Sequence, residues 1–326
     1  MQSSHSAQVS PSRVPATPAP FARSDDSLWG LVGHTPLLRL GRMGRRFESP
    51  VELWGKAEFL NPTGSVKDRA AFGIVRAALS SGELSAGRTL LDASSGNTGI
   101  SYAMLGARLR FPVAICLPRN ASPERVQRLK AYGAEAIFTD PADGTDGAQR
   151  EARRRASTEP DRYYYPDQYN HPANPEAHFL GTGPEIWGQT AGRATHLFAG
   201  VGTGGTISGV GRFLKQIEPG IRIIGVEPDA PLHGIEGLKH LPTALRPGTY
   251  DPRWVDETIR VATEDAQVMT RRLAREEGLF VGTSSGAAVA AMLSVAERVS
   301  APAVMVAILP DGGDRYLSDR YWEETA

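Results

Sequence analysis

The sequence has little cysteine, no excess of charge and no long apolar run. It contains one cysteine in 326 residues, which excludes an internal disulfide and a cysteine-rich metal site, and we expect no metal centre. Lysine plus arginine equal aspartate plus glutamate at 36 each, so the charge indicates neither a nucleic-acid nor an anionic-membrane partner. No apolar run approaches the roughly 20 residues that cross a bilayer, and the amino-terminal residues lack the basic and apolar parts of a signal peptide. These absences predict a cytoplasmic protein.

Two stretches are interpreted from their composition. Residues 1–26 are rich in Ser, Pro and Ala and carry almost no large apolar side chains, so they cannot bury enough surface to offset the entropy of ordering. We expect a disordered tail there. Cys116 lies in the apolar run 112–117, where we expect a buried and unreactive thiol.

From Leu28 onward, short β-like runs alternate with longer runs of helical apolar spacing, which is typical of parallel sheets covered by helices on both faces. Strands are expected at 51–59, 89–93, 113–117, 136–139, 195–199, 221–226 and 303–309, and helices at 66–79, 98–109, 123–132, 147–155, 175–190, 206–216, 264–277 and 286–299. A segment rich in Tyr and Pro, 163–175, interrupts the alternation. We therefore predict two α/β domains, 27–171 and 172–326, with the first segment crossing to the larger second domain and a ligand cleft between them.

The stretch Asn61-Pro62-Thr63-Gly64-Ser65-Val66-Lys67 places a lysine in the first turn of an expected helix, with Ser65 as its expected cap. Peptide dipoles at a helix start disfavour an ammonium ion, and burial would lower the pKa of Lys67 further. A neutral lysine amine is a nucleophile towards carbonyl groups. The alternative interpretation of Lys67 is a solvated surface lysine beside a turn.

Three further loops follow expected strands and open expected helices, which suits each of them to an anion. The loop Gly202-Thr203-Gly204-Gly205-Thr206 offers backbone amides and two hydroxyls to one phosphate, and it lacks the Gly-Lys-Ser/Thr ending of a nucleotide-binding loop. The loop Ser94-Ser95-Gly96-Asn97-Thr98-Gly99 is suited to a carboxylate, and Thr283-Ser284-Ser285-Gly286 opens a third helix. An ordinary capped turn is the alternative interpretation of the last two loops.

These four stretches, in this order and at these separations, resemble the β-family of pyridoxal-phosphate enzymes and, more narrowly, the cysteine synthases or O-acetylserine sulfhydrylases. The similarity runs from about Leu28 to Leu317 and includes Gly33-His34-Thr35-Pro36-Leu37, residues 168–175 and residues 182–187. The resemblance implies the tryptophan synthase β-like fold, also called fold type II, with two mainly parallel twisted sheets covered by helices. The loop 234–242 is nearest to the B-type isozyme, from which it departs by inserting Glu236-Gly237-Leu238 before Lys239.

The resemblance also implies roles for individual residues. Lys67 would hold pyridoxal 5'-phosphate as a Schiff base and then act as the general base at the substrate Cα. The remaining implied cofactor contacts are Gly202, Thr203, Gly204, Gly205 and Thr206 at the phosphate, Asn97 at the ring hydroxyl and Ser284 at the pyridine nitrogen. The implied substrate contacts are Ser94, Ser95, Gly96, Thr98, Gln168 and Gly234. Because a neutral serine does not keep the pyridine protonated, the ring is a weaker electron sink, which favours elimination of a β-leaving group over transamination.

The activity implied is a β-replacement that makes L-cysteine from an O-activated L-serine, in the first place O-acetylserine, and sulfide through an aminoacrylate. Cystathionine β-synthase and O-phosphoserine sulfhydrylase are alternatives, and Lys239 and Arg246 would favour a phosphorylated donor if they are more than solvated loop charges. A serine or threonine dehydratase is a third enzyme class, although those enzymes more often carry Ser-x-Lys at the lysine. A non-catalytic cofactor-binding regulatory protein would be expected to lack Lys67 or Asn97, and both are present.

Assembly is expected from the resemblance alone. Family members commonly pair through the larger domain, so a homodimer is expected. Some cysteine synthases bind the carboxyl-terminal tail of serine acetyltransferase in the active-site cleft, but B-type forms generally do not. We therefore expect no such complex for this chain.

Overall fold

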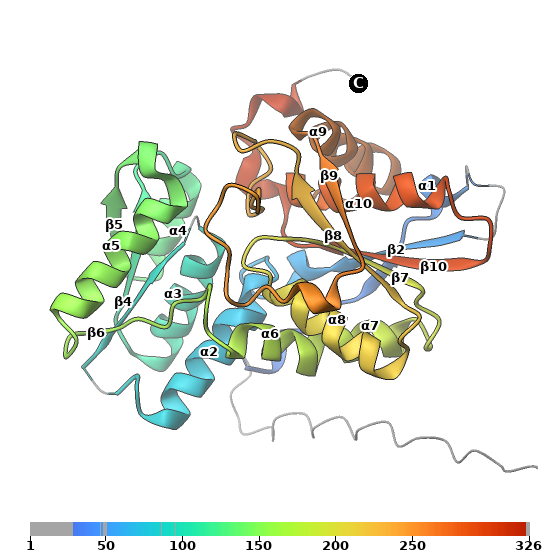
Figure 1. Cartoon of the computed structure of the whole chain (residues 1–326). Coiled ribbons are helices and arrows are strands. Elements are labelled where there is room, and N and C mark those ends of the chain that lie inside the picture. The colour runs from blue at the N-terminus through green and yellow to red at the C-terminus, as the bar shows by residue number, and fades with distance from the viewer. Residues whose placement is uncertain (1–28, 46, 48–50, 86, 95, 324–326) are drawn as a thin grey trace, which may run out of the picture.

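The computed structural model describes residues 29–45, 47, 51–85, 87–94 and 96–323. The expected tail, 1–26, and the predicted site residue Ser95 lie outside the described residues. Two sheets, one of six strands and one of four, organise the described part of the chain, and helices pack against both (Figure 1). The predicted α/β class with mainly parallel sheets is therefore confirmed.

The six-stranded sheet has the order β1-β2-β10-β7-β8-β9, which places an early strand beside the last one. The pair β1 and β2 is antiparallel, whereas all the other neighbours are parallel. The strands are β1 (Leu37–Arg39), β2 (Val51–Ala57), β7 (His196–Gly200), β8 (Arg222–Pro228), β9 (Glu257–Val261) and β10 (Ala303–Leu309).

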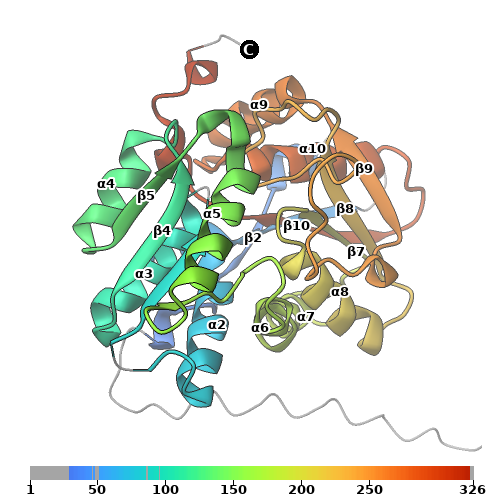
Figure 2. The same cartoon turned by 60° about the vertical axis from the view of Figure 1, so that its left-hand side comes forward.

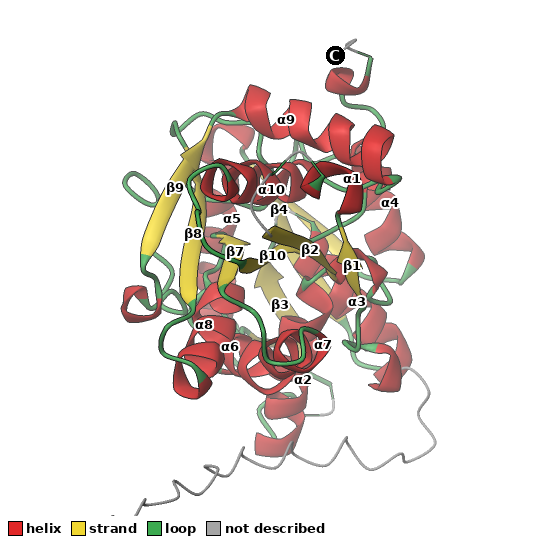
Figure 3. Cartoon of the chain, turned by 90° about the vertical axis from the view of Figure 1, so that its right-hand side faces the viewer, coloured by secondary structure: helices red, strands yellow, loops and turns green. Residues whose placement is uncertain are grey.

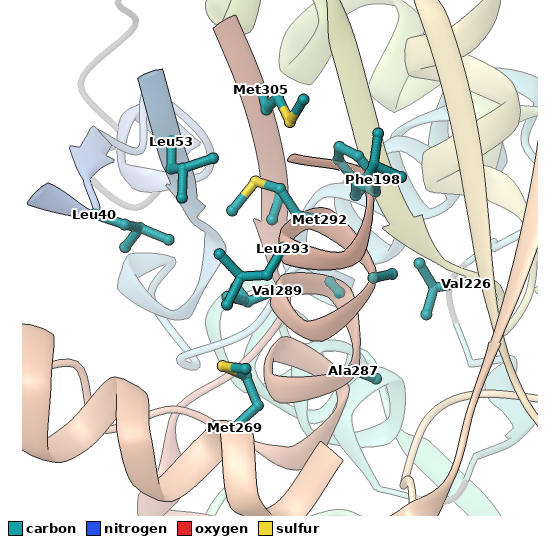
Figure 4. Close-up of a cluster of buried hydrophobic side chains, with 14 of the residues drawn as sticks. Leu40, Leu53, Phe198, Val226, Met269, Ala287, Val289, Met292, Leu293 and Met305 are labelled. Atoms are coloured by element: carbon teal, nitrogen blue, oxygen red, sulfur yellow. The ribbon is translucent and has the colours of Figure 1, made fainter. Parts of the chain in front are cut away.

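Helices cover both faces of this sheet (Figure 3). One face carries α1 (Gly41–Gly44), α9 (Thr263–Arg272) and α10 (Thr283–Ala296), and the other carries α6 (Ala173–Ala177), α7 (Gly183–Gln189) and α8 (Gly205–Ile217). Because α10 lies between the sheet and α9, it is apolar on nearly all sides. Its Val289, Met292 and Leu293 belong to a buried cluster with Phe198 and Met305 (Figure 4).

The four-stranded sheet has the order β5-β4-β3-β6 and is parallel throughout. Its strands are β3 (Thr89–Ala93), β4 (Val113–Pro118), β5 (Glu135–Thr139) and β6 (Tyr163–Tyr164). The strands β4 and β5 lie side by side in Figure 2. The helices α2 (Lys67–Ser81), α3 (Asn97–Leu109) and α4 (Pro123–Ala131) share one apolar cluster with this sheet, and α5 (Gly144–Thr158) packs on its other face. Cys116 lies in the cluster beneath α5, where burial raises the pKa of its thiol to about 12, so the expected buried thiol is confirmed.

Most expected elements are present, with ends that differ by at most three residues, except that the expected helix 264–277 is α9 followed by a π-helical segment, Leu273–Glu277. Three strands, β1, β6 and β9, were missed. The first two are too short to show a period of two, and β9 lies at the sheet edge, where Thr258 and Arg260 are exposed on one face and Glu257 and Ile259 are only partly buried on the other. The expected helix 175–190 is α6 and α7 joined by a π-helical turn, His178–Thr182.

The division into two domains stays a prediction, although the pairing of β2 with β10 places the first strands in the six-stranded sheet. None of the described helices is long and apolar enough to cross a membrane.

Candidate active site

Lys67 is the first residue of α2 and is presented by a tight turn. The amide of Gly64 donates to the carbonyl of Asn61 at 2.7 Å, and Gly64 has a φ of 83°, which favours glycine. Val66, not the expected Ser65, is the cap residue of α2, because the helix begins one residue later than predicted. The Ser65 hydroxyl still accepts a hydrogen bond from the Lys67 amide at 3.3 Å.

The turn is fixed by the segment that follows β10. The Val66 amide donates to the Pro310 carbonyl at 2.8 Å, and a β-bridge pairs Ser65 with Asp311. The Arg315 guanidinium donates to the carbonyls of Thr63 and Gly64, the latter at 2.7 Å. The position of Lys67 therefore depends on contacts between distant parts of the sequence.

Lys67 lines a cavity of about 540 Å³ whose walls come from helices and loops of both sheets. Removal from water lowers the pKa of its amine, the nearby Asp311 carboxylate partly opposes this effect, and Arg315 adds to it. Lys67 Nζ makes no hydrogen bond or ion pair with any described residue. The predicted lowering of the pKa is confirmed, with burial as its main cause.

A buried ion cluster lies behind the first turn of α2. The Arg69 guanidinium donates to Glu58 at 2.7 and 2.8 Å and to Glu185 at 2.8 and 2.7 Å. Lys56 Nζ lies 2.6 Å from Glu185 Oε2, and the Thr35 hydroxyl donates to Glu58 at 2.7 Å. Loss of water alone would raise the pKa of Glu185, but the bonds from Arg69 and Lys56 lower it to about 2. Two of the stretches that carry the family resemblance, 33–37 and 182–187, meet in this cluster.

The glycine-rich loop before α8 leaves several amides available to a ligand. The amides of Gly202, Thr203, Gly204 and Thr206 have no acceptor among the residues that the structure describes, and the Gly205 amide donates to the Thr203 hydroxyl at 3.3 Å. Gly204 has a φ of 83°, and α8 begins at the next residue. Gly202 and Thr203 line the cavity, with the start of α8 directly behind them. This arrangement fits one phosphate group at a helix amino terminus.

The loop before α3 forms the second polar wall of the cavity, lined by Ser94, Thr98 and Gln168. The Ser94 hydroxyl accepts hydrogen bonds from the amides of Gly96 and Gly99 at 3.0 and 3.1 Å, which leaves its proton free to be donated. The Thr98 hydroxyl donates to Gln168 Oε1 at 2.6 Å, and the Gln168 side chain donates to the Ala93 carbonyl. We call Ser94, residues 96–99 and Gln168 the carboxylate nest.

The two side chains that the resemblance assigns to the cofactor ring each keep one polar atom without a partner in the described chain. Asn97 lines the cavity, and its Oδ1 is buried without a hydrogen-bond partner among the described residues. Ser284, on the first turn of α10, is 4% exposed, and its hydroxyl makes no hydrogen bond within the described chain. An unpartnered polar atom beside a cavity is a place where a bound ligand can supply the missing hydrogen bond. These two polar atoms, together with the backbone amides before α8 that have no acceptor in the described chain, fit a phosphorylated, polar aromatic ring, as in pyridoxal phosphate.

The remaining predicted site residues are placed as follows. Gly234 is exposed, and its amide donates to the Thr263 hydroxyl at 2.9 Å, while its neighbours His233 and Ile235 line the cavity. The hydroxyl oxygen of Thr206 is 3.2 Å from Nε2 of His178, which is within hydrogen-bonding distance. Arg125 also lines the cavity but was not predicted as a site residue. Its only local feature in the sequence is its place near the start of a helix, which does not indicate a binding role.

Comparisons with known proteins agree with this geometry. Residues 28–311 match the family described as pyridoxal-phosphate dependent enzyme. The cysteine synthase of Aquifex aeolicus is 47% identical over 92% of this chain and 93% of its own length, and cysteine synthase B of Salmonella typhimurium is 44% identical over 88% and 93%. The crystal structure of a cysteine synthase from Entamoeba histolytica superposes with a TM-score of 0.88 at 35% identity, covering 98% of this chain and 95% of that one. The chain therefore belongs to the pyridoxal-phosphate dependent enzymes and, among them, to the cysteine synthases.

Proposed function

We propose that the chain is an O-acetylserine sulfhydrylase, which makes L-cysteine from O-acetyl-L-serine and sulfide with pyridoxal 5'-phosphate. One observation carries this proposal: a lysine amine of lowered pKa lies in the same cavity as a nest for a phosphate and a nest for a carboxylate. The names of the relatives support the activity, and cysteine synthases form one family with this chain.

The chain's own groups account for the binding of both molecules. Residues 202–206 would hold the cofactor phosphate, with Asn97 and Ser284 at the ring. Bound there, pyridoxal phosphate supplies an electron sink for the substrate Cα. The Ser94 hydroxyl and the second side-chain amide proton of Gln168 would donate to the substrate carboxylate, while the Thr98 hydroxyl holds Gln168 in place.

Lys67 Nζ is the proton carrier of this site. Because burial lowers its pKa, the amine is more readily in the neutral form that can accept the proton from Cα. Removal of that proton allows acetate to leave from Cβ, and sulfide then forms the new bond at Cβ.

The proposal is tested by a panel of donors. The purified protein should show the visible absorbance of lysine-bound pyridoxal phosphate and should form cysteine from O-acetylserine and sulfide. Conversion of unactivated serine with homocysteine, and not of O-acetylserine, would instead support a cystathionine β-synthase. Absence of the cofactor absorbance would contradict the proposal at its first step.

A homodimer in the cytoplasm is the expected assembly. Large apolar side chains are exposed on segments that meet at the Arg69 cluster, namely Leu31 at 59%, Leu60 at 55% and Leu180 at 37%. Exposed apolar groups of this size favour an interface, and the second copy of the chain is the partner that we propose. Sedimentation equilibrium should give the mass of a dimer, and Leu60→Asp should shift the equilibrium towards the monomer.

No complex with the tail of serine acetyltransferase is expected, and a pull-down with that tail would test this.

A further inference from the structure

Two ion pairs join opposite sides of the cavity mouth. The segment 229–252, which follows β8 of the six-stranded sheet, contributes Glu236 and Lys239. Glu236 pairs with Arg125 of α4, and Lys239 Nζ lies 3.0 Å from Asp146 Oδ1 of α5. Both partners belong to helices of the four-stranded sheet. All four residues line the cavity.

Arg125 connects the mouth with the carboxylate nest. Its side chain is 5% exposed and lies so close to Gly96 that a Cβ there would be 2.4 Å from Arg125 Cδ. Its guanidinium lies 5.4 Å from the centre of the Tyr316 ring. Burial alone would lower the pKa of Arg125, but the nearby Glu236 carboxylate raises it above the ordinary value, as expected for a guanidinium that faces a carboxylate. A second anionic group on a substrate held by the nest would find this cation already bound to a carboxylate.

Glu236 is held in place by the two residues that follow it. A Cβ on Gly202 would lie 2.1 Å from the Gly237 carbonyl oxygen, so residue 237 packs directly on the glycine-rich loop. The Leu238 side chain packs equally closely on Gly200. The insertion 236–238 is therefore anchored on one side of the cavity and extends its carboxylate to the other.

We propose that Glu236 is a specificity-determining residue that selects against substrates with a second anionic group. By binding Arg125 and adding its own negative charge at the mouth, it disfavours O-phosphoserine as donor and thiosulfate as acceptor. Serine esters with an uncharged leaving group, together with sulfide, are then preferred. This inference rests on the proposed β-replacement activity and extends it to the class of donor and acceptor.

The test compares Glu236→Gln with the wild type. The amide has nearly the same shape but lacks the charge, so the variant removes both the ion pair with Arg125 and one negative charge at the mouth. The ratio of kcat/KM for O-phosphoserine to that for O-acetylserine should rise at least about tenfold, because the repulsive element of the selection is removed. Asp143→Asn is the matched control. Asp143 also lines the cavity, but its carboxylate pairs with the exposed Arg150 at 2.8 Å, so this variant removes one charge without releasing Arg125.

Binding measured by calorimetry gives a second readout. The variant Glu236→Gln should bind O-phosphoserine and thiosulfate more tightly than the wild type, whereas Asp143→Asn should not. The role of Glu236 would be overturned if the donor ratio and the anion affinities of Glu236→Gln stayed within twofold of the wild-type values. It would also be overturned if Asp143→Asn showed an equal rise, or if the wild type preferred O-phosphoserine. Failure of every donor to react in the wild type would instead refute the β-replacement activity, while the calorimetric comparison would still report on Glu236.

Discussion

Asp311 and Asn97, 214 positions apart in the chain, are joined by a hydrogen bond of 2.7 Å from Asn97 Nδ2 to Asp311 Oδ2. The Tyr316 hydroxyl donates to the same oxygen at 2.7 Å, and Asp311 forms a β-bridge with Ser65. One carboxylate thus orients the side chain assigned to the cofactor ring and borders the turn that presents Lys67. The two sheets contribute to one site at this point.

Asp311→Ala should lower kcat/KM by about 10- to 100-fold, since a hydrogen bond to a charged group contributes about 1.5–3 kcal/mol. The variant frees the Asn97 amide and removes the negative charge that partly opposes the lowered pKa of Lys67. Steady-state kinetics with O-acetylserine and a titration of pyridoxal phosphate would measure both consequences. Asp314→Ala is the control, because that side chain is 64% exposed and lies on the same segment. Equal kinetics for the two variants would contradict the positioning role of Asp311.

Lys67→Ala should reduce the formation of cysteine by at least about 10²–10⁴-fold, the range expected for loss of a general acid–base group. The absorbance of the lysine-bound cofactor should also disappear. Lys130→Ala, which changes an exposed lysine on α4, should retain both properties. Activity that persists in Lys67→Ala would show that another group moves the proton.

The loops that contain the candidate site residues were predictable from the sequence because each is formed by residues that are adjacent in the chain. Residues 94–99 and 202–206 combine glycines with hydroxyl side chains between a strand and a helix, so their shape is set by a few adjacent residues. Their meeting in one cavity could be expected only from the resemblance, because the pairing of β2 with β10 depends on contacts across most of the chain.

Arg125 and Glu58 show what the sequence could not reveal. Each resembles an ordinary surface charge in its local context, yet the fold buries both and supplies partners more than ten residues away. Long-range ion pairs have no sequence period, so their partners become known only with the fold. The strand β9 was missed for a related reason, since it lies at a sheet edge where Thr258 and Arg260 face solvent and the opposite face is only partly buried.

Arg69→Leu should lower the free energy of unfolding by about 3–5 kcal/mol, because it leaves the buried carboxylate of Glu58 without its main partner. Arg69→Lys should be less damaging, yet a single ammonium group cannot donate to Glu58 and Glu185 in the same forked geometry. Denaturant unfolding would measure both variants. Arg253→Leu removes a mostly exposed partner of Asp251 and should leave the unfolding midpoint nearly unchanged. Similar midpoints for the Arg69 and Arg253 variants would show that the cluster does not stabilise the fold.

The buried carboxyl group of Asp92 should make the free energy of unfolding depend on pH. This carboxyl group is fully buried behind the carboxylate nest, where it accepts hydrogen bonds from the amides of Ala93 at 2.7 Å and Gln168 at 3.2 Å. Burial raises its pKa to about 8 from the ordinary value of 3.8. Between these values the folded protein keeps a proton that the unfolded chain has released. The contribution of Asp92 to the free energy of unfolding therefore falls as pH rises, by at most about 1.4 kcal/mol per pH unit, and becomes constant above the folded pKa.

Asp92→Asn has no group that titrates at this position, so its free energy of unfolding should increase relative to the wild type from about pH 5 to about pH 8. Denaturant unfolding of both proteins across this range would measure the difference directly. Asp161→Asn, at an exposed position, controls for the loss of one carboxyl group. A difference between Asp92→Asn and the wild type that stays constant with pH would show that Asp92 is already ionised in the folded protein, which would place a negative charge directly behind the proposed carboxylate nest.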